Sequence, residues 1–128
     1  MVKILHVEDN ATQRELIQRL LELEMEDCEI QFAGNGVEGF NRAQSWQPDI
    51  ILMDLRMPQM DGFEAIQSLK TTPATAHIPI IAISAWANVK NEERALALGA
   101  SRCIVKPFDL DEVLTTINIC LKESRRVP

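Results

Sequence analysis

The chain has 128 residues, of which 46% are hydrophobic and 25% charged, and 19 acidic against 13 basic residues give a net charge of −6. These values are typical of one soluble globular domain, expected over residues 1–128, and the acidic balance argues against direct nucleic-acid binding. No apolar run reaches the ~18 residues of a membrane span, and three cysteines at unpaired spacings favour a reducing compartment, so we expect a cytoplasmic protein.

Five short runs rich in Val, Ile and Leu predict β-strands. In chain order they are Val2–Val7, Glu29–Ala33, Ile50–Met53, Ile80–Ile83 and Cys103–Val105. All but the second are nearly continuous in apolar residues, which is typical of strands that are covered on both faces.

Segments with helical spacing of apolar residues separate these strands. We expect helices over about 12–23, from 37 to before Pro48, over 63–71, over 90–98 and from 109 to about 121. The apolar residues expected on their buried faces are Leu16, Ile17, Leu20, Leu21, Val37, Phe40, Ala43, Phe63, Ile66, Leu69, Leu110, Val113, Leu114, Ile117 and Leu121.

Local signals mark where three of these helices begin or end. Thr12 and Glu15 match the capping-box pattern at the start of the first helix. Gly99 is placed to stop the fourth helix, and Asp109 and Glu112 can cap the last one.

The alternation of strands and helices decides the fold class. Strands joined through helices use right-handed crossovers, which gives a parallel sheet with helices on both faces. The sequence therefore predicts an α/β fold, a doubly wound five-stranded parallel sheet.

Polar side chains stand where four of the predicted strands end. Glu8 and Asp9 follow the first strand, Asp54 the third, Ser84 the fourth and Lys106 the fifth. Since the carboxyl ends of parallel strands meet at one edge of a sheet, these side chains should lie close together. Three carboxylates repel one another unless a cation offsets them, and Mg²⁺ prefers such oxygen ligands.

This set of groups suits phosphoryl transfer. A carboxylate such as Asp54 can act as a nucleophile toward phosphorus and form an aspartyl-phosphate. Lys106 and Ser84 could then donate to the new phosphoryl oxygens.

Each of these side chains also has a purely structural interpretation. Asp9 could cap the following helix, Ser84 could bond to the backbone at a strand end, and Lys106 could be an ordinary surface lysine. Asp61, which precedes Gly62, is expected only to build a turn. The coincidence of suitable side chains at four strand ends favours the phosphoryl-acceptor interpretation.

Four motifs carry a family resemblance, and they are Val7-Glu8-Asp9-Asn10, Met53-Asp54-Leu55-Arg56-Met57-Pro58 with Met60-Asp61-Gly62, Ile83-Ser84-Ala85 and Val105-Lys106-Pro107-Phe108. In order and spacing they resemble the receiver (response regulator) domain of bacterial two-component signalling. The resemblance covers essentially the whole chain, and it implies the flavodoxin-like strand order 2-1-3-4-5.

The resemblance also implies a role for each site residue. It makes Asp54 the phosphoacceptor, with Mg²⁺ held by Glu8, Asp9, Asp54 and the backbone carbonyl of Arg56. It makes Lys106 and Ser84 the groups that contact the phosphoryl group. It further implies a cis peptide bond between Lys106 and Pro107.

As implied by the resemblance, the phosphoryl donor would be a histidine kinase or a histidine phosphotransfer protein. Output would pass to a downstream protein through the face made by the fourth helix, fifth strand and last helix, or along a phosphorelay. A homodimer that forms on phosphorylation fits the same pattern. The chain would be no enzyme toward other substrates, although it would assist its own phosphorylation and dephosphorylation.

The sequence departs from the family pattern at one position. Cys103 stands three residues before Lys106, where the family has an aromatic residue that turns inward on phosphorylation. A thiol is too small to report the switch in that way. Trp86, two residues after Ser84, is an alternative reporter, or else simply packs the loop there.

The two histidines have no assigned role. His6 lies inside a buried strand, where a hydrogen-bonded core residue is expected rather than a phosphocarrier. His77 is expected in the loop before the fourth strand.

Three other functions compete with the signalling interpretation. A phosphohydrolase of the haloacid dehalogenase type would need a second Asp two residues after the nucleophile, where this chain has Arg56. A flavodoxin would need a hydroxyl-rich phosphate loop where Glu8 and Asp9 stand. A receiver-like interaction module that is never phosphorylated is left open by Cys103.

Overall fold

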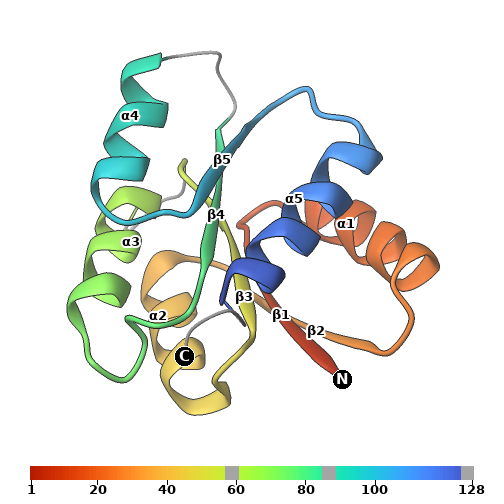
Figure 1. Cartoon of the computed structure of the whole chain (residues 1–128), viewed down its shortest axis with the longest axis horizontal. Helices are drawn as coiled ribbons and strands as arrows, with labels where there is room; N and C mark the ends of the chain where they lie inside the picture. Colours follow the sequence, from red (N-terminus) through yellow and green to blue (C-terminus); the bar gives the residue numbers. More distant parts are fainter. Residues whose placement is uncertain (57–60, 85–88, 125–128) are drawn as a thin grey trace.

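A computed structural model describes residues 1–56, 61–84 and 89–124 of the chain. Its strands form one parallel sheet in the order β2-β1-β3-β4-β5 (Figure 1). The strands are β1 Val2–Val7, β2 Cys28–Ala33, β3 Ile50–Asp54, β4 Ile80–Ser84 and β5 Arg102–Val105. The helices are α1 Ala11–Glu24, α2 Gly36–Trp46, α3 Gly62–Thr71, α4 Val89–Ala97 and α5 Leu110–Ser124. The predicted fold class and strand order are confirmed.

The sheet is covered by helices on both faces. Leu5 and Val7 of β1 belong to an apolar cluster shared with α2, α3 and α4, whereas Ile4 belongs to a cluster shared with α1 and α5. This alternation follows from the two-residue period of a strand, and Figure 1 shows the two helix layers on either side of the sheet.

Coverage is complete in the middle of the sheet and partial at its edges. Every residue of β3 and β4 is buried, but in β5 only Ile104 is buried and Arg102 is exposed. The prediction that the fifth strand is covered on both faces is still confirmed, because Cys103 packs on the side of α4 and Ile104 on the side of α5. The partial burial of β5 reflects its position at the edge of the sheet. Its apolar run is short, and one side of the strand has no neighbour in the described sheet.

The capping-box prediction for the first helix is also wrong. The helix begins at Ala11, so Thr12 lies inside it. Asn10 is the N-cap, and its side chain accepts a hydrogen bond from the Gln13 backbone N–H at 3.0 Å. Asn is among the best capping residues, and it stands two positions before the Thr that the pattern favoured.

Three apolar side chains that we expected to be buried are exposed. Leu16 is 55% exposed because it lies outside the stripe of α1 that faces the sheet, which begins at Ile17. Val37 is 45% exposed because α2 contacts the sheet through small residues, one of which, Gly39, lies directly against Val7. Leu110 is 48% exposed and is the first residue of α5, one turn before its buried stripe begins at Val113.

Other local predictions are confirmed. Gly99 follows α4 with φ of 117°, a left-handed conformation that favours glycine. The Asp109 carboxylate accepts a hydrogen bond from the Glu112 backbone N–H at 2.8 Å and so caps α5. The peptide bond between Lys106 and Pro107 is cis.

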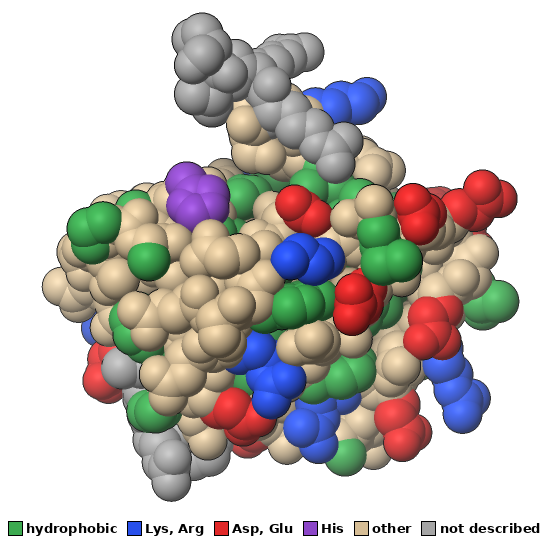
Figure 2. Space-filling model, turned by 90° about the horizontal axis from the view of Figure 1, so that it is seen from below, with side chains coloured by type: hydrophobic (Ala, Val, Ile, Leu, Met, Phe, Trp, Pro, Cys, Tyr) green, Lys and Arg blue, Asp and Glu red, His purple; other side chains and the backbone are tan. Residues whose placement is uncertain are grey.

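The amino-terminal edge of the sheet carries charges of both signs. Figure 2 views the molecule from this side and shows acidic and basic side chains interspersed with small apolar areas. None of the helices in the described ranges is long and apolar enough to cross a membrane.

Candidate functional site

The predicted site residues meet at the carboxyl edge of the sheet. Glu8, Asp54 and Ser84 are only 3%, 6% and 3% exposed, although all three are polar. Asp9 beside them is exposed to solvent. Buried polar side chains gathered at the ends of three strands are a common mark of a site in open α/β sheets.

Three carboxylates form a compact cluster at this edge. One carboxylate oxygen from each of Glu8, Asp9 and Asp54 lies within 4.8 Å of the others. The Lys106 ammonium reaches the cluster, with its Nζ 3.5 Å from Glu8 Oε1. The Arg56 backbone N–H donates to Asp54 Oδ1 at 3.0 Å, which orients the central carboxylate.

The backbone brings Lys106 and Ser84 together. Ser84 pairs with Val105 in the sheet, and the Lys106 N–H donates to the Ser84 carbonyl at 2.7 Å. The pairing between β4 and β5 thus continues for one hydrogen bond beyond the end of β5, to the lysine. This bond fixes the point from which the ammonium reaches Glu8.

Glycine at position 62 allows α3 to start directly behind Asp54. A Cβ on Gly62 would overlap the backbone carbonyl of Asp54 and the Cα of Leu55. Because these are backbone atoms on a central strand, neither can move aside easily. The start of α3 therefore lies against the backbone of Asp54 in a close contact that only glycine permits.

Asp61 has a larger structural role than the turn we predicted for it. It is the N-cap of α3, and its Oδ1 accepts a hydrogen bond from the Glu64 N–H at 2.9 Å. The prediction that Asp61 only builds a turn is wrong, because its extended backbone leads straight into the helix. The sequence signal was present, since Asp is a preferred N-cap residue.

Asn residues cap two of the other helices at this edge. The side chain of Asn35 accepts from the Glu38 N–H at 2.8 Å, and Asn10 caps α1 as described above. With Asn10 in that position, the interpretation of Asp9 as the helix cap is wrong, and the Asp9 carboxylate belongs to the acidic cluster.

The acidic cluster is short of positive charge. The pKa of Glu8 is raised to about 8, mainly by burial and then by a hydrogen bond with Asp54 and the negative charge of Asp54. The charge of Lys106 acts in the opposite direction but does not outweigh them. A bound cation would relieve this repulsion, and an all-oxygen donor set suits a hard ion.

His6 is buried, as predicted, but it is not a fully hydrogen-bonded core residue. The side chain is 1% exposed, and its Nδ1 has no hydrogen-bond partner in the described structure. Burial and the nearby charges of Lys106 and Arg14 lower its pKa to about 3. Its ring packs against Phe32, with the ring centroids 5.9 Å apart.

Cys103 lies half-buried against the cluster shared with α2, α3 and α4. Burial, with the charge of Glu92, raises the pKa of its thiol to about 11, so it is uncharged at neutral pH. Trp86, the alternative reporter, lies outside the described residues, and His77 is exposed in the loop before β4.

Comparison with known proteins places the chain in a family. The family model of the response regulator receiver domain matches residues 4–118. The chain therefore belongs to the response regulator receiver domain family, whose members are signalling phosphoacceptors controlled by phosphorylation.

Two curated relatives illustrate the range of this family. The chain is 32% identical to the DNA-binding dual master transcriptional regulator RpaA of Synechocystis sp. over 128 residues, all of this chain and 52% of RpaA. It is 33% identical to the polar-differentiation response regulator DivK of Brucella anthropi, over 94% of this chain and 97% of DivK. The chain thus spans about half the length of RpaA and nearly all of DivK.

A solved structure gives the same result for the fold. The signal receiver domain of a signal transduction histidine kinase from Syntrophus aciditrophicus superposes with a TM-score of 0.89 at 29% identity. The match covers 100% of this chain and 96% of the other.

Proposed function

We propose that the chain accepts a phosphoryl group on Asp54 and signals through protein contacts or a phosphorelay. The observation that carries this proposal is the buried Asp54 carboxylate, which shares one cluster with Glu8 and Asp9 and lies beside a lysine. Membership of the receiver family supports it. The proposal takes residues 1–128 as one receiver domain that works in the cytoplasm.

Mg²⁺ is the cofactor that this donor set fits best. We assign Glu8, Asp9, Asp54 and the backbone carbonyl of Arg56 as its ligands, with water completing the shell. Burial, followed by the hydrogen bond with Asp54 and its negative charge, raises the pKa of Glu8, and the crowding of three carboxylates supports a cation at this position. When bound, Mg²⁺ would neutralise charge on the phosphoryl oxygens and hold them near the acceptor.

The proposed transfer needs only one nucleophile from the chain. A carboxylate oxygen of Asp54 attacks the phosphorus of the donor and forms an acyl phosphate. The bond between phosphorus and the donor's leaving group breaks, and the leaving group keeps the electron pair and gains a proton. The Arg56 N–H, which already donates to Asp54 Oδ1, orients the carboxylate for this attack.

Lys106 and Ser84 are proposed to hold the phosphorylated state. The ammonium of Lys106 is close enough to the cluster to exchange its contact with Glu8 for one with a phosphoryl oxygen. Ser84 lies at the end of the neighbouring strand β4 and would donate its hydroxyl proton to another oxygen. Both residues stabilise charge and neither is consumed, so the domain assists its own phosphorylation and dephosphorylation without acting on other substrates.

A groove beside Lys106 supports a protein as the phosphoryl donor. It has a volume of about 400 Å³ and is lined by Gln13, Leu16, Lys106, Pro107 and Phe108. Leu16 is 55% exposed there, so the groove joins apolar surface to the edge of the site. We propose a histidine kinase or a histidine phosphotransfer protein as the donor that rests on this surface.

Output is proposed to leave through the face made by α4, β5 and α5. Cys103 of β5 packs toward the cluster shared with α4, where a switch residue would have to act. Because its thiol is small, we propose that another residue passes the signal to this face. A homodimer that forms on phosphorylation is a second form this output could take.

Intact mass measurement tests the proposal directly. The wild type, incubated with acetyl phosphate and Mg²⁺, should gain one phosphoryl group, and chelation of Mg²⁺ should prevent this. Asp54→Asn should gain none, whereas Asp111→Asn, which removes an exposed acid on α5, should behave as the wild type does.

Two outcomes would overturn the proposal. The absence of an adduct on the wild type would favour an interaction module that is never phosphorylated, and an equal adduct on Asp54→Asn would place the acceptor elsewhere. Continuous turnover of added phosphate esters, without a lasting adduct, would favour the Mg²⁺-dependent phosphohydrolase instead.

A further inference from the structure

The edge strand β2 carries hydrogen-bonding groups that the described sheet does not use. β2 pairs with β1 alone, in parallel, with Val2 opposite Cys28 and Val7 opposite Ala33. The carbonyls of Asp27 and Ala33 accept hydrogen bonds from the β1 side. Since successive residues of a strand turn these groups to opposite sides, the N–H and C=O groups of Cys28, Ile30 and Phe32 face the open edge.

The two faces of β2 differ in chemistry. Cys28, Ile30 and Phe32 are half-buried and apolar, and they lie on the face that α1 covers. Glu29 is exposed and Gln31 half-buried, and both lie on the face that α2 covers. An unpaired edge with one apolar and one polar side is a template for another strand.

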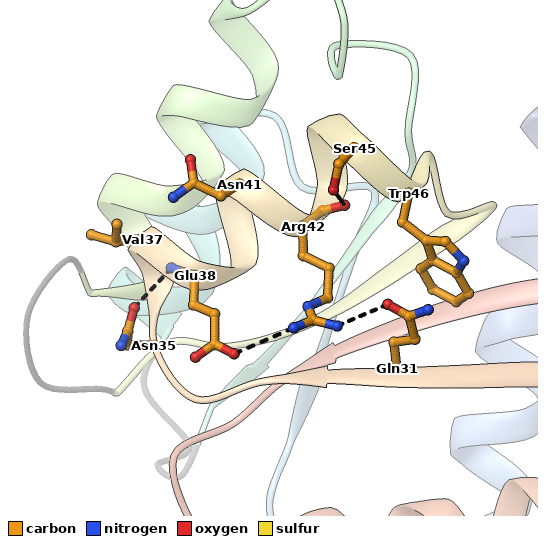
Figure 3. Close-up of a pocket in the computed structure, with 8 residues that line it drawn as sticks. All are labelled: Gln31, Asn35, Val37, Glu38, Asn41, Arg42, Ser45 and Trp46. Atoms are coloured by element: carbon orange, nitrogen blue, oxygen red, sulfur yellow. Dashed lines mark hydrogen bonds and ion pairs between the residues drawn. The ribbon is translucent and has the colours of Figure 1, made fainter.

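A groove runs between β2 and α2 on the polar side, with a volume of about 670 Å³. Figure 3 shows Arg42 reaching across it from α2 to β2, where its Nη1 donates to Gln31 Oε1 at 3.0 Å. Arg42 also forms an ion pair with Glu38, at 3.7 Å between Arg42 Nη2 and Glu38 Oε1. This long, half-exposed pair leaves the guanidinium with capacity for a second acid.

We propose that β2 is a contact between two copies of this chain, paired antiparallel about a twofold axis at Ile30. In that register Ile30 faces Ile30 of the second copy, and Cys28 faces Phe32. The outward N–H and C=O groups of all three residues then form hydrogen bonds between the copies. The apolar side chains meet on the face covered by α1, where they are half-exposed in a single chain.

The same register is complementary in charge on the other face. It sets Glu29 of one copy opposite Gln31 of the other, in a position where cross-strand side chains approach closely. The Glu29 carboxylate then enters the groove and reaches the Arg42 guanidinium bound to Gln31. The twofold axis forms this pair of Glu29 and Arg42 twice, so the β2 edge of one copy is complementary to the same edge of the other.

This contact requires no phosphoryl group, so it differs from a dimer that forms on phosphorylation. Analytical ultracentrifugation of the unphosphorylated chain at ~1 mM should detect a dimer even if its dissociation constant is near ~1 mM. Glu29→Arg should weaken the association about tenfold or more. The new arginine at position 29 of each copy would then lie close to Arg42 of the other copy, so that two cations repel each other at both contacts. Arg42→Glu should do the same.

The double variant Glu29→Arg with Arg42→Glu decides between a specific pair and a general charge effect. It should restore the association, because the acid and the base have merely exchanged places. Glu93→Arg makes the same change of charge on the exposed surface of α4 and should leave the association unchanged. Circular dichroism of each variant checks that the fold is retained.

Three results would overturn the inference. One is a wild type that stays monomeric up to ~1 mM. Another is a dimer that neither single charge reversal weakens, and the third is a double variant no better than the singles. A monomer whose β2 binds an added extended peptide would assign the edge to another partner.

Discussion

β3 and β2 lie in the same sheet, separated only by β1, yet they differ in how much of each strand is buried. β3 is buried over all five residues and presents one carboxylate, Asp54, at its end. In β2 only Ala33 is buried, and the strand presents an open backbone edge along its length. A strand enclosed on all sides can hold a reactive group rigidly, whereas an edge strand can take up another partner.

The largest difference should appear when a large side chain is removed from each strand. Leu52→Ala on β3 should lower the free energy of unfolding by about 3 kcal/mol, since the side chain is fully buried and its removal leaves a cavity. Ile30→Ala on β2 should cost roughly 1 kcal/mol, since Ile30 is half-exposed. Urea unfolding of dilute protein measures the free energy of unfolding of both variants. Equal decreases would show that the buried strand and the edge strand do not differ in their contribution to stability.

The close contact behind Asp54 gives the next largest effect. Gly62→Ala should cost about 2–3 kcal/mol, because the added Cβ meets backbone atoms of β3. Gly34→Ala, at the end of β2, is the matched control. Its Cβ would lie 3.5 Å from the nearest atom, Glu38 Oε2, so stability should change by about 1 kcal/mol or less. Gly62→Ala should also slow phosphorylation, and a variant with wild-type stability would show that the contact relaxes easily.

His6 lies on β1 between these two strands and should make stability depend on pH. Its pKa is lowered from 6.5 to about 3 in the folded protein, so below pH 6.5 the unfolded state binds the additional proton. Stability is therefore lost as the pH falls from about 6.5 toward 3, and the loss between pH 7 and 5 should be about 2 kcal/mol.

The test of this pH dependence compares the wild type with His6→Val, which keeps an apolar side chain in the strand. Glu8 acts in the opposite direction, because its pKa is raised to about 8 and a falling pH stabilises the fold until about pH 4.5. Since Glu8 is present in both proteins, the difference between their unfolding curves reports His6. Equal pH dependence in the two proteins would show that His6 does not cause the loss of stability at low pH.

The smallest effect should come from the helix cap after β3. Asp61→Ala should lower stability by about 1 kcal/mol, because the Glu64 N–H loses its acceptor. Asp61→Asn should remain close to the wild type, since the amide oxygen can accept the same bond. Thermal unfolding separates the two variants, and equal destabilisation by both would show that the negative charge matters instead.

The sequence was sufficient to predict the strand ends and therefore where the candidate site lies. The buried run before Asp54 and the polar residues after the other strands mark one edge of a parallel sheet, and the structure brings Glu8, Asp9 and Asp54 together there. Side chains at strand ends are predictable in this way because topology alone places them.

Helix faces and caps were harder to predict. Leu16 has the apolar spacing of a buried residue, but the width of the buried stripe depends on how α1 lies on the sheet. Asn10 and Thr12 compete for the same cap, and pattern matching favoured the wrong one. The unpartnered Nδ1 of His6 depends on distances that no sequence pattern contains.

Asp54, the carboxylate at the end of the buried strand, is the residue that we propose receives the phosphoryl group. Borohydride reduces an acyl phosphate to an alcohol, so treatment of the phosphorylated chain should convert the acceptor aspartate to homoserine. Peptide sequencing by mass spectrometry should then find homoserine at position 54 and aspartate unchanged at positions 9 and 61. Homoserine at another position, or none at 54 in a chain that carries the phosphoryl mass, would contradict the claim.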